Sequence, residues 1–200
     1  MKNKKFYKII RKAISKDLAK FCSDYLVMKS QVLRTFLKEK WIPERNVIHG
    51  VFNDPQAPGA FSIYGDQAME TLLCKVKPKM EKILNTKLVE TYAYARVYYK
   101  GNDLKKHRDR MSCEISTTLN LGGDHWPIYI EPKIKVDLEP GDMLVYTGCT
   151  LTHWREPFEG EYCAQTFLHF NQKTEENLKN IYDERLHLGL PSVRILNTKK

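Results

Sequence analysis

The sequence predicts an α+β domain in which helices come first and a meander of strands follows. In the first part of the chain, apolar residues recur every three or four positions, which is typical of helices that bury one stripe. From Leu88 onward the period changes to two, and short strand-like runs alternate with turn residues. Such a meander is expected to close into a sandwich or a barrel.

Residues 1–87 are predicted to be mainly helical support for the strands. Ser15 is the candidate N-cap of a first helix with one apolar stripe. The segment 53–66, NDPQAPGAFSIYGD, is rich in turn formers and predicts an ordered loop. A second helix is expected over 69–84, with an interruption before Pro78 because proline removes a backbone donor and crowds the preceding turn.

The strands are predicted within residues 88–171. The separators KGND, GGDH, EPGD and FEGE supply the turn residues between them. The predicted strand runs are LVETYAYARVYY, CEISTTLNL, WPIYIEP, IKVDL, DMLVYTG, LTHWREPF and YCAQTFLHF.

Residues 172–200 are predicted to form a C-terminal helix and tail. The helix is expected to begin near Thr174 and to bury Leu178, Ile181 and Tyr182. The chain shows no linker or internal repeat, so residues 1–200 are interpreted as a single domain.

The net charge of +9 is concentrated at the start of the chain, since residues 1–20 carry +7 and the remainder only +2. A basic amphipathic opening of this kind predicts a solvated helix face rather than an arm that binds nucleic acid. Nucleic acid is therefore not an expected partner.

The sequence indicates a soluble, cytoplasmic protein without a membrane partner. No apolar run approaches the roughly 18 residues of a membrane span, and the N-terminus has no signal-peptide pattern. The cysteines are odd in number, scattered and never spaced as CxxC, which predicts reduced core thiols rather than disulfides or a zinc ribbon. They are Cys22, Cys74, Cys113, Cys149 and Cys163.

His107 and Asp109 form a candidate pair of metal ligands. They are alternate residues of an extended segment that follows a glycine turn, so both side chains can point to one side. His153, which begins a late strand, is the candidate third ligand. Two imidazoles and one carboxylate with open positions opposite suit non-haem Fe(II), whereas zinc would more often recruit thiolates.

The other histidines have simpler interpretations. His49, His125 and His187 lie in expected loops or a helix and are predicted to be structural. His169 alternates with Gln165 and Phe167 and could face the barrel interior, but it is interpreted first as a core residue.

Five segments in order carry a family resemblance: YYKGNDLKKHRDR, CEISTTLNL, LEPGDMLVY, LTHWREPF and CAQTFLHF. Together they resemble the Fe(II)- and 2-oxoglutarate-dependent dioxygenases, in particular the prolyl 4-hydroxylase-like branch. The resemblance covers residues 88–171. It implies a double-stranded β-helix, the jelly-roll or cupin-like fold, with the N-terminal helices against its major sheet and the metal at its mouth.

The resemblance also implies an activity. His107, Asp109 and His153 match the family's facial triad for Fe(II), with 2-oxoglutarate as cosubstrate and O₂ as oxidant. Such enzymes hydroxylate a C–H bond and release succinate and CO₂. Asp109 favours hydroxylation, because related halogenases carry a small residue at that position. The substrate is expected to be a peptide side chain or a small molecule.

The cation that holds the far carboxylate of 2-oxoglutarate departs from the family pattern. Related enzymes usually place an Arg or Lys shortly after the distal His, in the window that Tyr162, Cys163 and Ala164 occupy here. Arg155 is the leading substitute, because it lies two residues beyond His153 on the same strand face.

Three further residues are candidates for the cosubstrate pocket. Arg96 is the competing cation, since it shares a strand face with several tyrosines. Tyr98 has the spacing from His107 that the family's pocket tyrosine shows, and its hydroxyl is expected to hydrogen-bond the cosubstrate. Thr117, on the following strand, resembles another pocket-lining residue by position.

Two alternatives remain open from the sequence. An oxidative nucleic-acid demethylase would fit the positive charge, but that branch resembles a pattern with two closely spaced arginines after the distal His, and only Arg155 is present before Arg185. A non-catalytic jelly-roll binding module is the other, because fold does not establish function. The sequence sets neither the substrate nor the oligomeric state.

Overall fold

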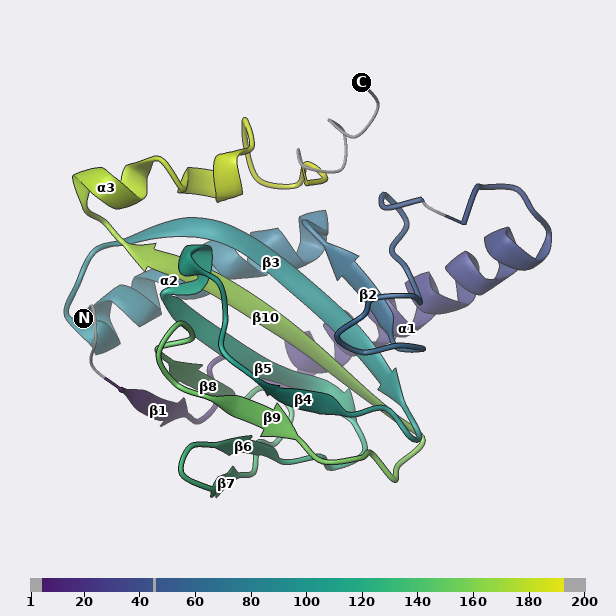
Figure 1. The fold of residues 1–200 in the computed structure, drawn as a ribbon, viewed down its shortest axis with the longest axis horizontal. Helices are drawn as coiled ribbons and strands as arrows, with labels where there is room; N and C mark the ends of the chain where they lie inside the picture. Colours follow the sequence, from purple (N-terminus) through teal and green to yellow (C-terminus); the bar gives the residue numbers. More distant parts are fainter. Residues whose placement is uncertain (1–4, 45, 193–200) are drawn as a thin grey trace.

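Two antiparallel β-sheets form the centre of the computed structural model, which describes residues 5–44 and 46–192. The larger sheet has the strand order β1-β8-β5-β10-β3-β2, and the smaller one has the order β4-β9-β6-β7. In Figure 1 the smaller sheet lies over one face of the larger sheet, while helices α1 and α2 lie behind the other face. This is the α+β arrangement that the sequence predicts.

Every run predicted as a strand contains one, and the change of period at Leu88 marks the start of β3. The strands are β1 (Tyr7–Ile10), β2 (Phe61–Tyr64), β3 (Leu88–Tyr99), β4 (Leu104–His107), β5 (Ile115–Gly123), β6 (Ile128–Ile130), β7 (Ile134–Val136), β8 (Met143–Tyr146), β9 (His153–Arg155) and β10 (Tyr162–Gln172). The helices are α1 (Lys16–Lys38), α2 (Gln67–Leu84) and α3 (Glu175–Leu178), with short 3-10 turns η1 (Met111–Cys113) and η2 (Ile181–Glu184).

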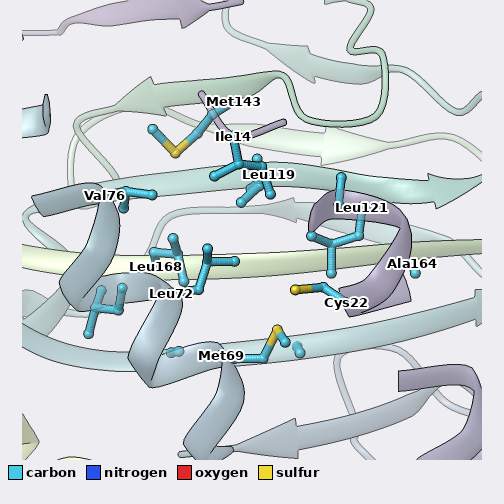
Figure 2. Packing of buried hydrophobic residues seen from close by; sticks show 14 of the residues in the cluster. Ile14, Cys22, Met69, Leu72, Val76, Leu119, Leu121, Met143, Ala164 and Leu168 are labelled. Carbon is cyan, nitrogen blue, oxygen red and sulfur yellow. The ribbon is translucent and has the colours of Figure 1, made fainter. Parts of the chain in front are cut away.

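Helices α1 and α2 bury their apolar stripes against the larger sheet. Ser15 caps α1 as expected, because its Oγ accepts a hydrogen bond from the Leu18 amide. None of the helices in the described ranges is long and apolar enough to cross a membrane. Figure 2 shows the packing of Cys22 from α1, Met69, Leu72 and Val76 from α2, and Leu119, Leu121 and Leu168 from the sheet.

The expectation that the basic opening forms a solvated helix face is wrong for residues 7–10, although the exposed Lys16 and Lys20 do lie on α1. Residues 7–10 form β1, which pairs antiparallel with β8, and Tyr7 lies opposite Tyr146. An edge strand has unpaired backbone groups that attract another strand, and β1 satisfies those of β8. Ile10 is buried in the core beside it. Residues 1–4 lie outside the described ranges.

The predicted loop over 53–66 contains a strand, β2, at its end. Phe61 and Ile63 are buried in the core under the helices, and β2 pairs with β3. The turn residues before β2 do form a loop. The prediction is wrong only for residues 61–64, whose alternating apolar side chains let them pair with β3.

The expected interruption of the second helix at Pro78 does not occur, and α2 is continuous. Proline removes one intrahelical hydrogen bond, which would reach the carbonyl of Cys74 on an exposed part of the helix where water can replace it. Val76 and Met80 continue the same buried stripe on both sides of Pro78.

The C-terminal helix is shorter than predicted. Helix α3 covers one turn, Leu178 is 44% exposed, and Asn177 is the buried member because its side chain hydrogen-bonds Glu114. The residues 182–184 that follow all have left-handed φ values, which turn the chain back toward the sheets.

A buried ion pair fastens this C-terminal segment to the core. Arg185 and Glu70 approach to 2.6 Å with side chains that are 1% and 2% exposed. Arg185 also donates to the carbonyl oxygens of Thr91 and Leu190. Its guanidinium therefore joins α2, β3 and the C-terminal segment.

We expect Glu70→Ala to lower the free energy of unfolding by about 3–5 kcal/mol, because it leaves Arg185 buried without a counter-charge. Urea denaturation followed by circular dichroism measures the change. Asp24→Ala is the matched control, since it breaks the exposed Lys20–Asp24 pair and should leave the stability nearly unchanged. Equal small losses in both variants would contradict the assignment.

Candidate metal centre

A cavity of about 260 Å³ opens between the two sheets, at the ends of β4 and β9. Strands of both sheets contribute to its wall, so the cavity lies inside the barrel that the two sheets form. Its lining includes His107, Asp109 and His153, the tyrosines Tyr64, Tyr92, Tyr94 and Tyr146, and Arg96, Arg110 and His169.

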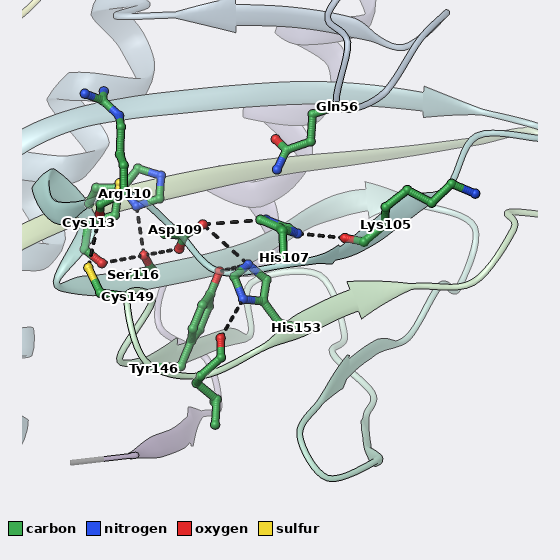
Figure 3. A network of polar contacts seen from close by, with 12 residues as sticks. Gln56, Lys105, His107, Asp109, Arg110, Cys113, Ser116, Tyr146, Cys149 and His153 are labelled. Carbon is green, nitrogen blue, oxygen red and sulfur yellow. Dashed lines mark hydrogen bonds and ion pairs between the residues drawn. The ribbon is translucent and has the colours of Figure 1, made fainter. Parts of the chain in front are cut away.

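The structure brings His107, Asp109 and His153 together. His107 ends β4 and lies directly opposite His153 on β9, and Asp109 follows two residues after His107. Oδ1 of Asp109 lies 3.6 Å from Nε2 of His107 and 3.5 Å from Nε2 of His153 (Figure 3). One ligand atom from each residue lies within 4.8 Å of the others, so a single metal ion can contact all three.

Backbone carbonyls fix the orientation of both imidazoles. Nδ1 of His107 lies 2.8 Å from the Lys105 oxygen, and Nδ1 of His153 lies 3.1 Å from the Leu151 oxygen. Because a carbonyl only accepts, each Nδ1 carries the hydrogen and each Nε2 presents a lone pair toward the cluster. The Tyr146 hydroxyl lies 3.3 Å from Nε2 of His153 and can donate to that lone pair.

Ser116 orients the carboxylate of Asp109. Its Oγ donates to Oδ2 over 2.6 Å, which leaves Oδ1 facing the imidazoles. Burial alone would raise the pKa of Asp109, but its contacts with the neighbouring imidazoles and the hydrogen bond from Ser116 hold that pKa well below its usual range. Burial lowers the pKa of His153, which keeps its imidazole neutral. Ionised carboxylate and neutral imidazole are the forms that bind a metal.

His169 lies at this site rather than only in the core, where the sequence placed it first. Nδ1 of His169 is 3.1 Å from Oγ of Ser116, and its ring lies 4.6 Å from that of Tyr92. Burial lowers the pKa of His169 to about 4, although the charge of Asp109 partly opposes the shift. Alternation along β10 places it inward, and that signal was visible in the sequence.

Arg155 is a buried cation without an acidic partner in the part of the chain that the structure describes. It lies on β9 two residues beyond His153 and is 2% exposed. Its guanidinium stacks 4.8 Å from the Trp126 ring and donates from Nη1 to the Trp126 carbonyl, while Nε has no partner. Burial lowers its pKa.

The guanidinium of Arg155 lies near Cys163, in the chain window where the family pattern would place a cation. Its positive charge favours the thiolate form of Cys163, although burial raises the pKa of that thiol overall. Arg155 on β9 therefore places a positive charge in this region of the interior.

Arg96, the competing cation, already has a counter-charge. Nη2 of Arg96 donates to Asp54 and Gln56, each over 2.7 Å. Nη1 donates to the Tyr98 hydroxyl over 3.3 Å, and the Tyr98 ring packs against Trp126. Tyr98 thus lies in the interior between the two arginines, whereas Arg96 lines the cavity as part of an ion pair.

The expectation that Thr117 lines the pocket is wrong. Side chains alternate along β5, so Ser116 and Thr118 point into the barrel, where they bond Asp109 and Gln165. Thr117 points the other way, and its Oγ accepts a hydrogen bond from the Leu168 amide.

A second ion pair forms the outer wall of the cavity. Arg110 donates from both terminal nitrogens to Asp183, over 2.8 and 2.6 Å, and its guanidinium lies 4.5 Å from the Tyr92 ring. The Tyr64 hydroxyl donates to the same carboxylate over 2.7 Å. Asp183 was not predicted from the sequence, because a left-handed turn brings it to the cavity from the far end of the chain.

No protein-family model and no curated protein sequence matches the chain. Solved structures do. AviO1 from Streptomyces viridochromogenes superposes with a TM-score of 0.61 at 13% identity, over 85% of this chain and 91% of AviO1. A prolyl-4-hydroxylase from Pseudomonas putida superposes with a TM-score of 0.56 at 15% identity, over 84% of this chain and 93% of that chain.

A third similar structure contains ligands. HygX from Streptomyces hygroscopicus, with nickel and 2-oxoglutarate bound, superposes with a TM-score of 0.56 at 12% identity, over 84% of this chain and 83% of HygX. At such identities the likeness establishes the fold alone. The expected double-stranded β-helix core is therefore confirmed, and so is the resemblance to the prolyl 4-hydroxylase-like branch at the level of the fold.

The low pKa of His169 makes stability depend on pH. A histidine that titrates near 6.5 when unfolded and at about 4 when folded contributes stability above pH 6.5, and this contribution is lost as the pH falls toward 4. We expect a loss of up to about 3 kcal/mol between pH 7 and pH 4 in the metal-free protein.

Urea denaturation at several pH values measures this loss. His169→Phe should show a flatter profile over the same range, because phenylalanine keeps the ring and cannot bind a proton. His187→Phe, which replaces an exposed histidine, should retain the full slope. Identical profiles for His169→Phe and the unmodified protein would refute the assignment.

Proposed function

We propose that the protein is a non-haem Fe(II)- and 2-oxoglutarate-dependent dioxygenase that hydroxylates its substrate. The observation that carries the proposal is the cluster of His107, Asp109 and His153 in the cavity between the two sheets, with the unpaired cation Arg155 enclosed nearby. AviO1, HygX and the prolyl-4-hydroxylase share the fold, and HygX is the one described with a metal and 2-oxoglutarate.

The donor set fits Fe(II). Two imidazole nitrogens and one carboxylate oxygen converge from one side, which leaves the opposite side for other ligands. The hydrogen bonds of both Nδ1 atoms and of Oδ2 hold the three donors in place before any ion arrives. Within the described residues no cysteine belongs to the cluster, which argues against a structural zinc site.

When bound, Fe(II) with 2-oxoglutarate and O₂ would supply oxidation of a C–H bond to an alcohol, with conversion of 2-oxoglutarate to succinate and CO₂. The chain contributes positioning. His107, Asp109 and His153 would hold the ion, Ser116 fixes the carboxylate of Asp109, and four tyrosines line the cavity around the site.

Arg155 is our candidate for the far carboxylate of 2-oxoglutarate. A buried guanidinium without a counter-ion is costly, and a carboxylate with matching geometry removes that cost. The charges of Asp109 and Arg155 both act on the pKa of Tyr146. This side chain therefore lies near the three candidate ligands and near the cation. We propose that the Tyr98 hydroxyl forms a hydrogen bond with the cosubstrate and that Arg96 is part of the cavity wall.

The proposal includes a cytoplasmic location. All five cysteines are free, although two of them are not buried, which fits a reducing compartment. The pairing of Arg96 and Arg110 with acidic side chains leaves no free cation among the described cavity-lining residues for a phosphate backbone, so the demethylase alternative gains no support.

His107→Ala and His153→Ala should each abolish succinate formation when the protein is incubated with Fe(II), 2-oxoglutarate and O₂, because two remaining ligands hold the ion too weakly. Chromatographic detection of succinate measures this. His49→Ala, which removes a histidine outside the cluster, should keep the activity. Full turnover in either cluster variant would disprove the metal assignment.

Arg155→Ala should weaken the binding of 2-oxoglutarate to the anaerobic Fe(II) protein by about a hundredfold, since it removes the cation that compensates a buried carboxylate. Titration of the metal-to-ligand charge-transfer absorption measures the affinity. Arg108→Ala is the control, because this arginine is exposed and donates a hydrogen bond to Thr152. An unchanged affinity in Arg155→Ala would show that another residue binds the far carboxylate of 2-oxoglutarate.

A further inference from the structure

We infer that the substrate is an uncharged molecule that donates an O–H or N–H group to Nε2 of His169. The inference rests on the proposed function, because it concerns the molecule that is oxidised at the metal. Two observations carry it: a hydrogen-bond chain that fixes the form of the His169 ring, and the pairing of the charges in the cavity.

The hydrogen-bond chain runs from Asp109 through Ser116 to His169. Oδ2 of Asp109 lies 2.6 Å from Oγ of Ser116, and Oγ lies 3.1 Å from Nδ1 of His169. An ionised carboxylate only accepts, so the hydroxyl hydrogen of Ser116 points to Asp109. The hydroxyl oxygen then accepts from Nδ1–H of His169. In a neutral imidazole this leaves Nε2 without a hydrogen, as an acceptor.

Nε2 of His169 is held in place and open to the cavity. No described residue forms a hydrogen bond with Nε2, whereas Nδ1 bonds Ser116. Nε2 is also absent from the fully buried polar atoms that lack a partner, so it is accessible from the cavity. The ring packs against Tyr92 at 4.6 Å, and His169 lines the cavity. A ligand that offers no donor would leave this desolvated acceptor unpaired, which is costly.

The remaining charges of the cavity wall cancel one another. Arg96 pairs with Asp54 at 2.7 Å, and Arg110 pairs with Asp183 at 2.6 Å. Beyond the metal ligands, no other charged residue lines the described cavity. A charged substrate would therefore lose its hydration without gaining a counter-ion, whereas an uncharged one would not.

An adjoining cavity offers space for the rest of the substrate. It measures about 230 Å³ and shares Tyr64, Tyr94 and Arg110 with the first cavity. Val47 and Val51 add apolar surface. An aromatic or aliphatic group attached to the donor fits this continuation.

The first experiment determines the ring form of His169 by ¹⁵N NMR of the full-length protein loaded with Zn(II) and 2-oxoglutarate, and again without either. We expect the hydrogen on Nδ1 in both samples. Ser116→Ala should lose this preference, because it removes the acceptor. A hydrogen on Nε2 in the unmodified protein would overturn the inference.

The second experiment compares small aromatic probes that differ in charge and in donor groups. Benzyl alcohol and benzamide are uncharged donors, anisole is uncharged without a donor, and benzoate and benzylammonium are charged. We expect the two donors to shift the Nε2 resonance of His169 and to bind about tenfold more tightly than the other three. The better of the two identifies the donor as O–H or N–H.

Anisole binding as well as benzyl alcohol, or benzoate or benzylammonium binding more tightly than both donors, would overturn the inference. His169→Phe keeps the ring against Tyr92 and should remove the tenfold preference for the donors. If this variant does not fold, the comparison of anisole with benzyl alcohol in the unmodified protein still tests whether a hydrogen-bond donor is needed. Loss of the proposed function would show separately, as a missing charge-transfer absorption with Fe(II) and 2-oxoglutarate.

Discussion

His107 lies opposite His153 where β4 pairs with β9, and this short antiparallel contact brings the candidate metal ligands together. Directly opposed residues in such a pair have Cα atoms only about 4.5–5.5 Å apart, so two imidazoles on the same face must converge. A shift of the register by one residue would turn them to opposite faces. Asp109 joins them because its amide donates to the Gly148 carbonyl, next to β9.

Buried charge organises the rest of the interior. Arg96, Arg110 and Arg185 each face a carboxylate within ion-pair distance, and these pairs connect loops and the C-terminal segment to the sheets. Arg155 differs, because the described chain supplies it only with a carbonyl oxygen and an aromatic ring. A carboxylate bound from outside the chain would supply the counter-charge that Arg155 lacks.

The strands and the metal ligands could be predicted from the sequence because they depend on local alternation and spacing. The same rule placed Arg155 on the face of His153. Thr117 was instead chosen by its resemblance in position to a family residue, and its side chain points to the opposite face of the sheet. Strand β1 and the pair of Asp183 with Arg110 depend on contacts between distant parts of the chain, which no local pattern records.

The ion pair of Arg110 with Asp183 has a consequence for how the outer wall can change. Two candidate metal ligands lie on β4 and β9 and the third follows β4 directly, whereas Tyr64 and Asp183 in the outer wall come from earlier and later segments of the chain. Mutations in those flanking segments can reshape the entrance without disturbing the donors. The outer wall can therefore change its shape while the three candidate ligands keep their positions.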